Sequence, residues 1–423
     1  MIKKITVFFL VFALFMHISV YAETLDCSTL ENETVFFSGE LYLPVCETLS
    51  ACGFALSWDK NSFAYRAESG DRIAVIPLNS YSLYINNEEM VLNNPTAFRN
   101  NVLYMPLSAA KEICQGWNFD VPVKNINFSI GDKYRFDSAE RYKDWYVCDD
   151  KFIFKQYYIS QSGALEYADI VRSISDSLPD VRIFDMLVPE GSEIYAPKSL
   201  QCGQVEAFNT AASALPQSVT VVNVCSGLYE RAAEKIYFNT DHHWTQRGAY
   251  YAYCEFLKVA GGSIDSIASF DSRDFFRYKG SYINEGYDRE NYEIMERFMP
   301  KGENIGYVYK DGDLLGEKKQ IQIINPDDNT YACFIGGDNA LTELCGNPES
   351  ERTLCIVKES FGNALATWAV NNYKTVYVVD VRKFEGTLSR LYDKVGFDDL
   401  LIESYAESVG SRDLRAALKK LAG

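Results

Sequence analysis

The hydrophobic pattern of residues 36 to 119 nearly repeats itself. Short alternating runs typical of strands, "SFAYRAE", "RIAVIPL" and "SYSLYINNEEMVL", separate two similar segments, "LYLPVCETLSACGFALSWD" and "LYMPLSAAKEICQGWNFD". In each segment a short strand leads to a proline, Pro44 or Pro106, which suits the first position of a helix because its missing N–H costs nothing there. A glycine, Gly53 or Gly116, then suits the left-handed residue after the helix. The pattern predicts a small α+β module.

After about Lys133 the pattern changes to strands that alternate with amphipathic helices, which predicts an α/β domain with a doubly wound, mostly parallel sheet. The runs "KFIFKQYYI" and "VRIFDMLVP" flank a helix from about Ala164 to Ser177 and predict a βαβ unit. Further strands are expected at "VTVVNV", "YACFIGG", "TLCIVKE" and "TVYVVDV". Residues 270 to 320 have weak periodicity and predict a long excursion over the edge of the sheet.

The start of the chain has the pattern of a secretory signal. Lys3 and Lys4 precede an apolar run that ends in small residues at Ala22, and no later stretch reaches the roughly 18 apolar residues that span a bilayer. We expect a protein that is secreted or held at the cell surface. A formal net charge of −17 argues against nucleic acid as a partner. The expected division is a signal peptide at 1–22, the α+β module at 23–131 and the α/β domain at 132–423.

Histidine is almost absent from the mature chain. Of three histidines in 423 residues, His17 lies in the signal, and the other two are adjacent in "NTDHHWT". A helix is expected to follow, with Thr245 as its N-cap. In an extended loop, residues two apart point the same way and neighbours point opposite ways. Asp241 and His243 are therefore expected to face one site, and His242 to point away.

An imidazole held by a carboxylate is the general-base half of a hydrolase triad, which also needs a nucleophile. In "LCIVKESFGNALATWAVNNY" the pattern predicts a strand over 354–358 and a helix from Phe361 to about Asn371. Ser360 then lies at the carboxyl end of a parallel strand and at the start of a helix, where α/β sheets bind ligands and helical N–H groups can meet an oxyanion. The alternative interpretation is that Ser360 only caps the helix.

Two parts of the chain resemble known families. The N-terminal repeat resembles the copper amine oxidase N-terminal-like domain of exported bacterial proteins, although no histidine lies there to bind copper. The segments "TDHHWTQRGAYYAY", "MLVPEGSEIYAP", "FIGGDNA", "IVKESFGNALATWAVNNY" and "VVDVRKF" resemble DHHW proteins over about residues 140 to 410. Those proteins are similar to exported SGNH-like alginate O-acetyltransferases. The resemblance implies a triad of Asp241, His243 and Ser360, with Glu359 where the family is expected to have aspartate.

Other matched positions are candidates for contacts with an oxyanion or a substrate. Gly336 and Gly337 could let backbone N–H groups approach an oxyanion, and Asn339 could donate a hydrogen bond, although two glycines more often form only a turn. Arg382 could steer an anionic or sugar substrate, or form a salt bridge with a neighbouring carboxylate. His242 could contact the substrate or pack within its loop.

The sequence therefore predicts an exported SGNH-like enzyme that transfers or removes an O-acetyl group on a surface or secreted polysaccharide through an acyl-Ser360 intermediate. The resemblance implies a membrane acyltransferase as a partner. Manganese phosphoesterases also carry Asp-His-His, but they need further ligands, and the mature chain has no third histidine; we expect no metal and no cofactor. A non-catalytic alternative remains open, in which the protein holds cell-wall glycan and some of its 29 tyrosines stack on sugars.

Overall fold

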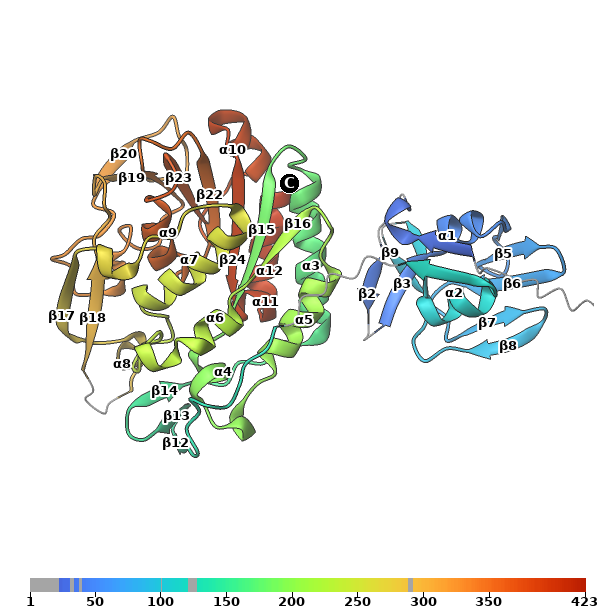
Figure 1. The fold of residues 1–423 in the computed structure, drawn as a ribbon, viewed down its shortest axis with the longest axis horizontal. Helices are drawn as coiled ribbons and strands as arrows, with labels where there is room; N and C mark the ends of the chain where they lie inside the picture. Colours follow the sequence, from blue (N-terminus) through green and yellow to red (C-terminus); the bar gives the residue numbers. More distant parts are fainter. Residues whose placement is uncertain (1–22, 31–33, 38–39, 100, 121–127, 288–291) are drawn as a thin grey trace, which may run out of the picture. The chain divides into compact units, whose positions relative to one another are not determined.

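The computed structural model describes residues 23–30, 34–37, 40–99, 101–120, 128–287 and 292–423. The chain divides into two compact units, residues 1–34 with 40–122 and residues 35–39 with 123–423. The expected signal peptide lies outside the described residues. In the described part of the chain, no helix has both the length and the apolar content that crossing a membrane requires. Each unit combines helices and strands (Figure 1).

The smaller unit has the α+β character that the sequence predicts. Helices α1 (Val45–Ala51) and α2 (Leu107–Ile113) each begin directly after a strand that ends in proline. The glycines that follow them, Gly53 and Gly116, have φ angles of 82° and 91°, a left-handed conformation that strains other residues. Five strands form an antiparallel meander in chain order: β4 (Ala55–Asp59), β5 (Ala64–Ser69), β6 (Arg72–Pro77), β7 (Ser82–Ile85) and β8 (Glu88–Val91).

The remaining strands of the module pack against one apolar core, which they share with the helices and the meander. Strand β10 (Val102–Pro106) pairs antiparallel with β3 (Glu40–Pro44) and β9 (Ala97–Arg99), and β1 (Glu23–Asp26) pairs parallel with β11 (Trp117–Asp120). Buried side chains of both helices, of β3 and of the meander meet there, among them Leu43, Leu49, Ala74, Ile76 and Ile113. The other short elements before residue 40 are η1 (Cys27–Thr29) and β2 (Val35–Phe37).

The larger unit is built on a mixed sheet of eight strands, so the α/β character expected from the sequence is confirmed, while the sheet combines parallel and antiparallel pairs. Its order is β16 (Val219–Asn223), β15 (Arg182–Val188), β24 (Asp399–Tyr405), β22 (Thr353–Lys358), β23 (Thr375–Asp380), β21 (Leu341–Cys345), β19 (Gly306–Tyr309) and β20 (Lys318–Ile321). The first five pair in parallel, and the last three add antiparallel pairs. Since β19 and β20 are joined by a short loop, they can only pair antiparallel.

The βαβ unit expected around residue 165 is wrong. Strand β14 (Phe152–Phe154) belongs to a separate antiparallel sheet with β13 (Trp145–Cys148) and β12 (Glu140–Tyr142). Asp149 and Asp150 take positive φ angles of 49° and 54° between β13 and β14, which turns the chain back as a hairpin. Helix α3 (Gln161–Asp176) therefore leads into β15 without a strand of the main sheet before it.

The strand expected at "YACFIGG" is also wrong. Residues 331–333 form the short helix η5 (Tyr331–Cys333), and three successive residues then have positive φ angles: Ile335 at 51°, Gly336 at 71° and Gly337 at 79°. An extended strand cannot contain such a run. Strand β21 begins only at Leu341, so the two glycines form a turn before a strand rather than after one.

Helices cover both faces of the main sheet. Helices α7 (Gln246–Ala260) and α9 (Gly362–Ala369) pack in one core, and α3, α5 (Gln204–Ala214) and α12 (Arg412–Ala422) pack in the other. Figure 1 shows α7 and α9 in front of the strands. The further elements of this unit are α4 (Gly191–Tyr195), η2 (Lys198–Leu200), α6 (Cys225–Glu230), η3 (Ala232–Glu234), η4 (Ile267–Ser269), β17 (Ser272–Tyr278), α8 (Ser281–Asn284), β18 (Glu293–Phe298), α10 (Leu388–Val395) and α11 (Ala406–Gly410).

Candidate active site

The two histidines lie at the tip of a tight loop that leads into α7. Tyr237 and Trp244 pair across the base of this loop, and Thr245 caps α7 by accepting a hydrogen bond from the N–H of Gly248, as the sequence predicts. The tip is fixed from outside. The buried carboxylate of Glu293 on β18 accepts hydrogen bonds from the backbone N–H groups of residues 239 and 240. The loop is therefore held at its base and near its tip before any ligand binds.

The carboxylate of Asp241 is the centre of the hydrogen-bond network in this loop. His243 donates to Asp241 Oδ1 from Nδ1 over 2.6 Å and from its backbone N–H over 2.9 Å. Asp241 Oδ2 accepts from the Tyr278 hydroxyl and from the backbone N–H of Ser281, each over 2.7 Å. Burial alone would raise the pKa of Asp241, but His243 and these donors hold it well below its usual range. The carboxylate thus stays ionised and orients the imidazole.

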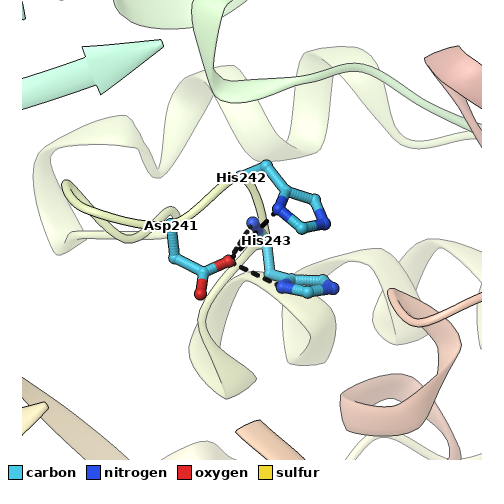
Figure 2. A group of neighbouring side chains, drawn as sticks. All are labelled: Asp241, His242 and His243. Carbon is cyan, nitrogen blue, oxygen red and sulfur yellow. Dashed lines mark hydrogen bonds and ion pairs between the residues drawn. The ribbon is translucent and has the colours of Figure 1, made fainter. Parts of the chain in front are cut away.

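His242 does not point away from the site, so the expectation of an extended loop is wrong at this residue. The rings of His242 and His243 lie side by side with their centroids 3.9 Å apart (Figure 2). The reason is the bond from the His243 N–H to the Asp241 side chain, which closes a turn in which neighbouring side chains no longer alternate. His242 Nδ1 shares a hydrogen bond of 2.9 Å with the Ser281 hydroxyl.

Three hydrogen bonds tie the histidine loop to the segment that carries Ser360. The Trp244 indole donates to the carbonyl of Phe361 over 2.9 Å. At the start of α7, the Gln246 side chain donates to the Thr367 hydroxyl on α9 over 2.7 Å. The Trp368 indole on α9 donates to the Gln246 carbonyl over 2.9 Å. The start of α7 is therefore locked against α9.

Ser360 lies between β22 and α9, half-buried, as the sequence predicts. Its carbonyl accepts the N–H of Asn363 over 3.2 Å. The ring of the next residue, Phe361, lies 5.1 Å from the His243 ring, centroid to centroid. His243 Nε2 is buried and accepts or donates no hydrogen bond among the described residues, so the Ser360 hydroxyl does not bond to it. Such catalytic bonds often form only when substrate binds.

Glu359 anchors the turn before Ser360. Its buried carboxylate accepts from the backbone N–H groups of Phe361 and Tyr405, over 3.2 Å and 2.9 Å, and from the Ser408 hydroxyl over 3.1 Å. Burial raises the pKa of Glu359 to about 7. This side chain points into the protein and joins the turn to the end of β24 and to α11.

Comparison with known proteins places the larger unit in a family. The family model described as DHHW protein matches residues 124–379, which is more than half of the chain. The chain belongs to the DHHW protein family. A second model, described as a copper amine oxidase N-terminal domain, matches residues 24–116. None of the curated proteins matches the chain.

Solved structures resemble the larger unit of this DHHW protein. A DHHW family protein from Eubacterium siraeum is 22% identical with a TM-score of 0.61, covering 67% of this chain and 97% of that one. Bacillus cereus PatB1 with a sulfonyl adduct is 16% identical with a TM-score of 0.54, covering 66% and 98%. These likenesses show a shared fold. The O-acetyltransferase domain of Pseudomonas putida AlgJ also matches, at 14% identity over 66% and 96%, but its TM-score of 0.37 is too low to bear on the fold.

In the DHHW protein two of the three predicted oxyanion donors, Gly337 and Asn339, are engaged within their own turn. The N–H of Gly337 donates to the carbonyl of Phe334 over 2.9 Å, and the Asn339 side chain donates to the carbonyls of Gly336 and Gly337 over 3.3 Å and 3.2 Å. The structure therefore gives the turn of residues 336–339 no side-chain donor that faces outward. Gly336 itself is exposed.

Arg382 forms the salt bridge that was one of its two predicted roles. Its guanidinium pairs with Asp380 over 2.6 Å and with Asp338 over 2.8 Å. Lys358, which is 1% exposed at the end of β22, joins the same network by pairing with Asp338 over 3.1 Å and Asp380 over 2.9 Å. The network fixes the glycine turn beside the Ser360 segment, since Asp338 also accepts from Asn363 over 2.9 Å.

Sequence reasoning missed the residues that surround the acid and base. Tyr278 and Ser281 bond to Asp241, and the ring of Tyr331 stacks on His243 with a centroid distance of 3.9 Å and an interplanar angle of 11°. Tyr278 and Ser281 lie in the stretch of weak periodicity from residue 270 to 320, and Tyr331 opens the run that was expected to be a strand. The only signal in the sequence was its richness in tyrosine, which does not distinguish a site from a packed core.

The group Asp241, His242 and His243 is the one cluster in the described residues whose ligand atoms could hold a metal ion, all lying within 4.8 Å of one another. Its chemistry fits an acid–base pair better. Both oxygens of Asp241 already accept hydrogen bonds from Tyr278, Ser281 and His243. A phosphoesterase metal centre needs further carboxylate or imidazole ligands, and the cluster has three members from consecutive residues.

We predict that Gly280→Ala displaces the Asp241 loop. A Cβ atom at Gly280 would lie 2.1 Å from the carbonyl oxygen of Thr240, so the two backbones would have to separate. The free energy of unfolding should fall by about 1–3 kcal/mol, as for overpacked interiors. Thermal and urea unfolding would measure the change. Gly302→Ala is the matched control because a Cβ there meets nothing within 4 Å. Equal stability of the two variants would contradict the close approach.

We also predict that His242 makes the fold sensitive to acid. Burial and the neighbouring His243 lower the pKa of His242 to about 3, whereas the unfolded chain binds that proton near pH 6.5. Because the unfolded state then holds more protons, stability falls as the pH falls below 6.5. Between pH 7 and pH 5 the wild type should lose about 2 kcal/mol more than His242→Gln. Urea unfolding at both pH values measures this, and parallel losses in the two proteins would refute it.

Proposed function

We propose that this DHHW protein is an exported serine O-acyltransferase or esterase that moves acetyl groups on a surface or secreted polysaccharide. The observation that carries the proposal is the buried pair of Asp241 and His243. The carboxylate fixes the imidazole through Nδ1 and leaves Nε2 without a protein partner among the described residues. In this arrangement the imidazole can act as a general base and accept a hydroxyl proton at Nε2.

The position of Ser360 supports its assignment as the nucleophile. It follows a parallel strand of the sheet and directly precedes α9, which is the position at which α/β sheets bind ligands. The hydrogen bond from Trp244 to the carbonyl of Phe361 holds this segment against the histidine loop.

The proposed reaction has two steps. Ser360 Oγ attacks the acyl carbonyl, its proton passes to His243 Nε2, and the bond to the leaving oxygen breaks as His243 returns that proton to it. A hydroxyl of the glycan, or water, then gives its proton to His243 and attacks the acyl-serine, which frees Ser360. A glycan acceptor makes the protein a transferase, and water makes it an esterase. A membrane acyltransferase that supplies acyl groups is the partner we propose.

We predict that Ser360→Ala abolishes release of p-nitrophenol from p-nitrophenyl acetate, with kcat lower by about 10⁴-fold or more. A sulfonyl fluoride is a fitting second probe, since the PatB1 structure carries a sulfonyl adduct. Mass spectrometry should find the wild type modified on the peptide that contains Ser360. Ser213→Ala on α5 is the matched control. If the wild type is inactive and unmodified but binds glycan, the non-catalytic alternative takes the place of this proposal.

We predict that substitutions of the two histidines have different effects on kcat. His243→Ala should lower kcat for p-nitrophenyl acetate by about 10³-fold or more because it removes the base. The kcat of Asp241→Asn should lie between those of the two histidine variants because the imidazole loses the carboxylate that orients it. His242→Ala should cost about tenfold or less, since its Nδ1 bonds to Ser281 rather than to the reacting groups. Circular dichroism checks folding. An inactive His242→Ala beside a nearly normal His243→Ala would reassign the base.

A further inference from the structure

Several buried polar atoms near Ser360 have no hydrogen-bond partner in the described part of the protein. They belong to four side chains: His243 (Nε2), Tyr331 (hydroxyl), Asn363 (Oδ1) and Glu403 (both carboxylate oxygens). A buried polar group without a partner costs free energy, and native proteins contain few. Such groups gathered at one place indicate a place where a polar ligand completes the hydrogen bonds.

The contacts of these side chains place them around the nucleophile. Asn363 lies on the first turn of α9 and donates its backbone N–H to Ser360. A Cβ at Gly362 would lie 3.0 Å from Glu403 Oε2, which puts that carboxyl under the start of the same helix. Glu403 is 1% exposed. Two of the four side chains thus border the Ser360 segment directly.

Tyr331 lies against the base, His243. Its ring is nearly parallel to that of His243, with an angle of 11° and centroids 3.9 Å apart. A hydroxyl on a ring stacked this closely lies within a few ångströms of the imidazole edge. Burial and the nearby charge of Asp241 raise the pKa of Tyr331 well above its ordinary value, so the hydroxyl keeps its proton.

Tyr331 also differs from the other three in chemistry. Asn363 Oδ1 is an acceptor, Glu403 donates only when protonated, and His243 is needed as the base. The tyrosine hydroxyl is a neutral donor at every pH at which the base can work. Of the donors predicted from the sequence, Gly336, Gly337 and Asn339, the last two are engaged within their own turn.

We propose that the Tyr331 hydroxyl donates a hydrogen bond to the carbonyl oxygen of the acyl group that Ser360 attacks, and to the oxyanion that this attack creates. Tyr331 would then be a catalytic residue of the site, and its stacked ring would hold His243 in place at the same time. The inference rests on the proposed acyl-transfer function. It gives the site a side-chain donor from η5, whereas the N–H groups of residues 361–363 already donate to Glu359 and Ser360.

Two substitutions separate the hydroxyl from the ring. Tyr331→Phe keeps the stack and removes the donor, so kcat/KM for p-nitrophenyl acetate should fall by about 10²-fold, as when one oxyanion donor is removed. The acid limb of its pH–rate profile, which follows the base, should keep its wild-type position. Tyr331→Leu removes both features, so its acid limb should shift as well. Tyr253→Phe is the matched control, because this buried tyrosine of α7 bonds instead to Asn372 over 3.0 Å.

The outcomes distinguish the inference from the function on which it rests. If the full-length wild type shows no Ser360-dependent release of p-nitrophenol, the proposed function fails and the inference fails with it. If the wild type is active and Tyr331→Phe stays within about twofold of it, the inference alone is overturned. A loss in Tyr331→Phe accompanied by a lower melting temperature and a shifted acid limb would also overturn it, because the hydroxyl would then act only on the structure.

Discussion

The geometry of the site depends on how the buried carboxylate of Asp241 is solvated. A carboxylate that is 4% exposed has lost its water and must find hydrogen bonds in the protein. Asp241 takes them from its own loop, from the Tyr278 hydroxyl at the end of β17 and from the N–H of Ser281 at the start of α8. Removing any one donor would leave an ion partly unsolvated in the interior. The position of the base is thus set by segments about 40 residues away in the sequence.

The second requirement is that the base and the nucleophile segment keep their relative position. Helices α7 and α9 share a core, and the indoles of Trp244 and Trp368 donate across their interface. Both bonds end on backbone carbonyls, so they fix the main chain rather than a mobile side chain. Trp244 is fully buried, which gives the bond little competition from water. Rigid elements that carry the reacting groups lose little entropy when a substrate binds.

Local rules of sequence reading located the two segments but not their detailed contacts. The cap at Thr245 and the place of Ser360 after β22 followed from short-range patterns, and so did the pairing of Asp241 with His243. The alternation rule failed at His242 because a side-chain hydrogen bond closed the loop into a turn. The ring of Tyr331 could not be placed beside His243, since stacking between distant segments leaves no periodic trace. Likewise, positive φ angles at Asp149 and Asp150 turned an expected parallel strand into a hairpin.

The strand that comes last in the sequence, β24, lies between β15 and β22 in the middle of the main sheet. Until residues 399–405 have been synthesised, the edges of β15 and β22 that β24 pairs with in the finished sheet have no partner strand. Pairings this distant in sequence form slowly, and open edges of this kind invite association with other chains. Assembly of the sheet must therefore follow synthesis of residues 399–405. A stop codon between Ser360 and Asp399 would leave a fragment that cannot complete this sheet, even though every residue of the proposed triad had been made.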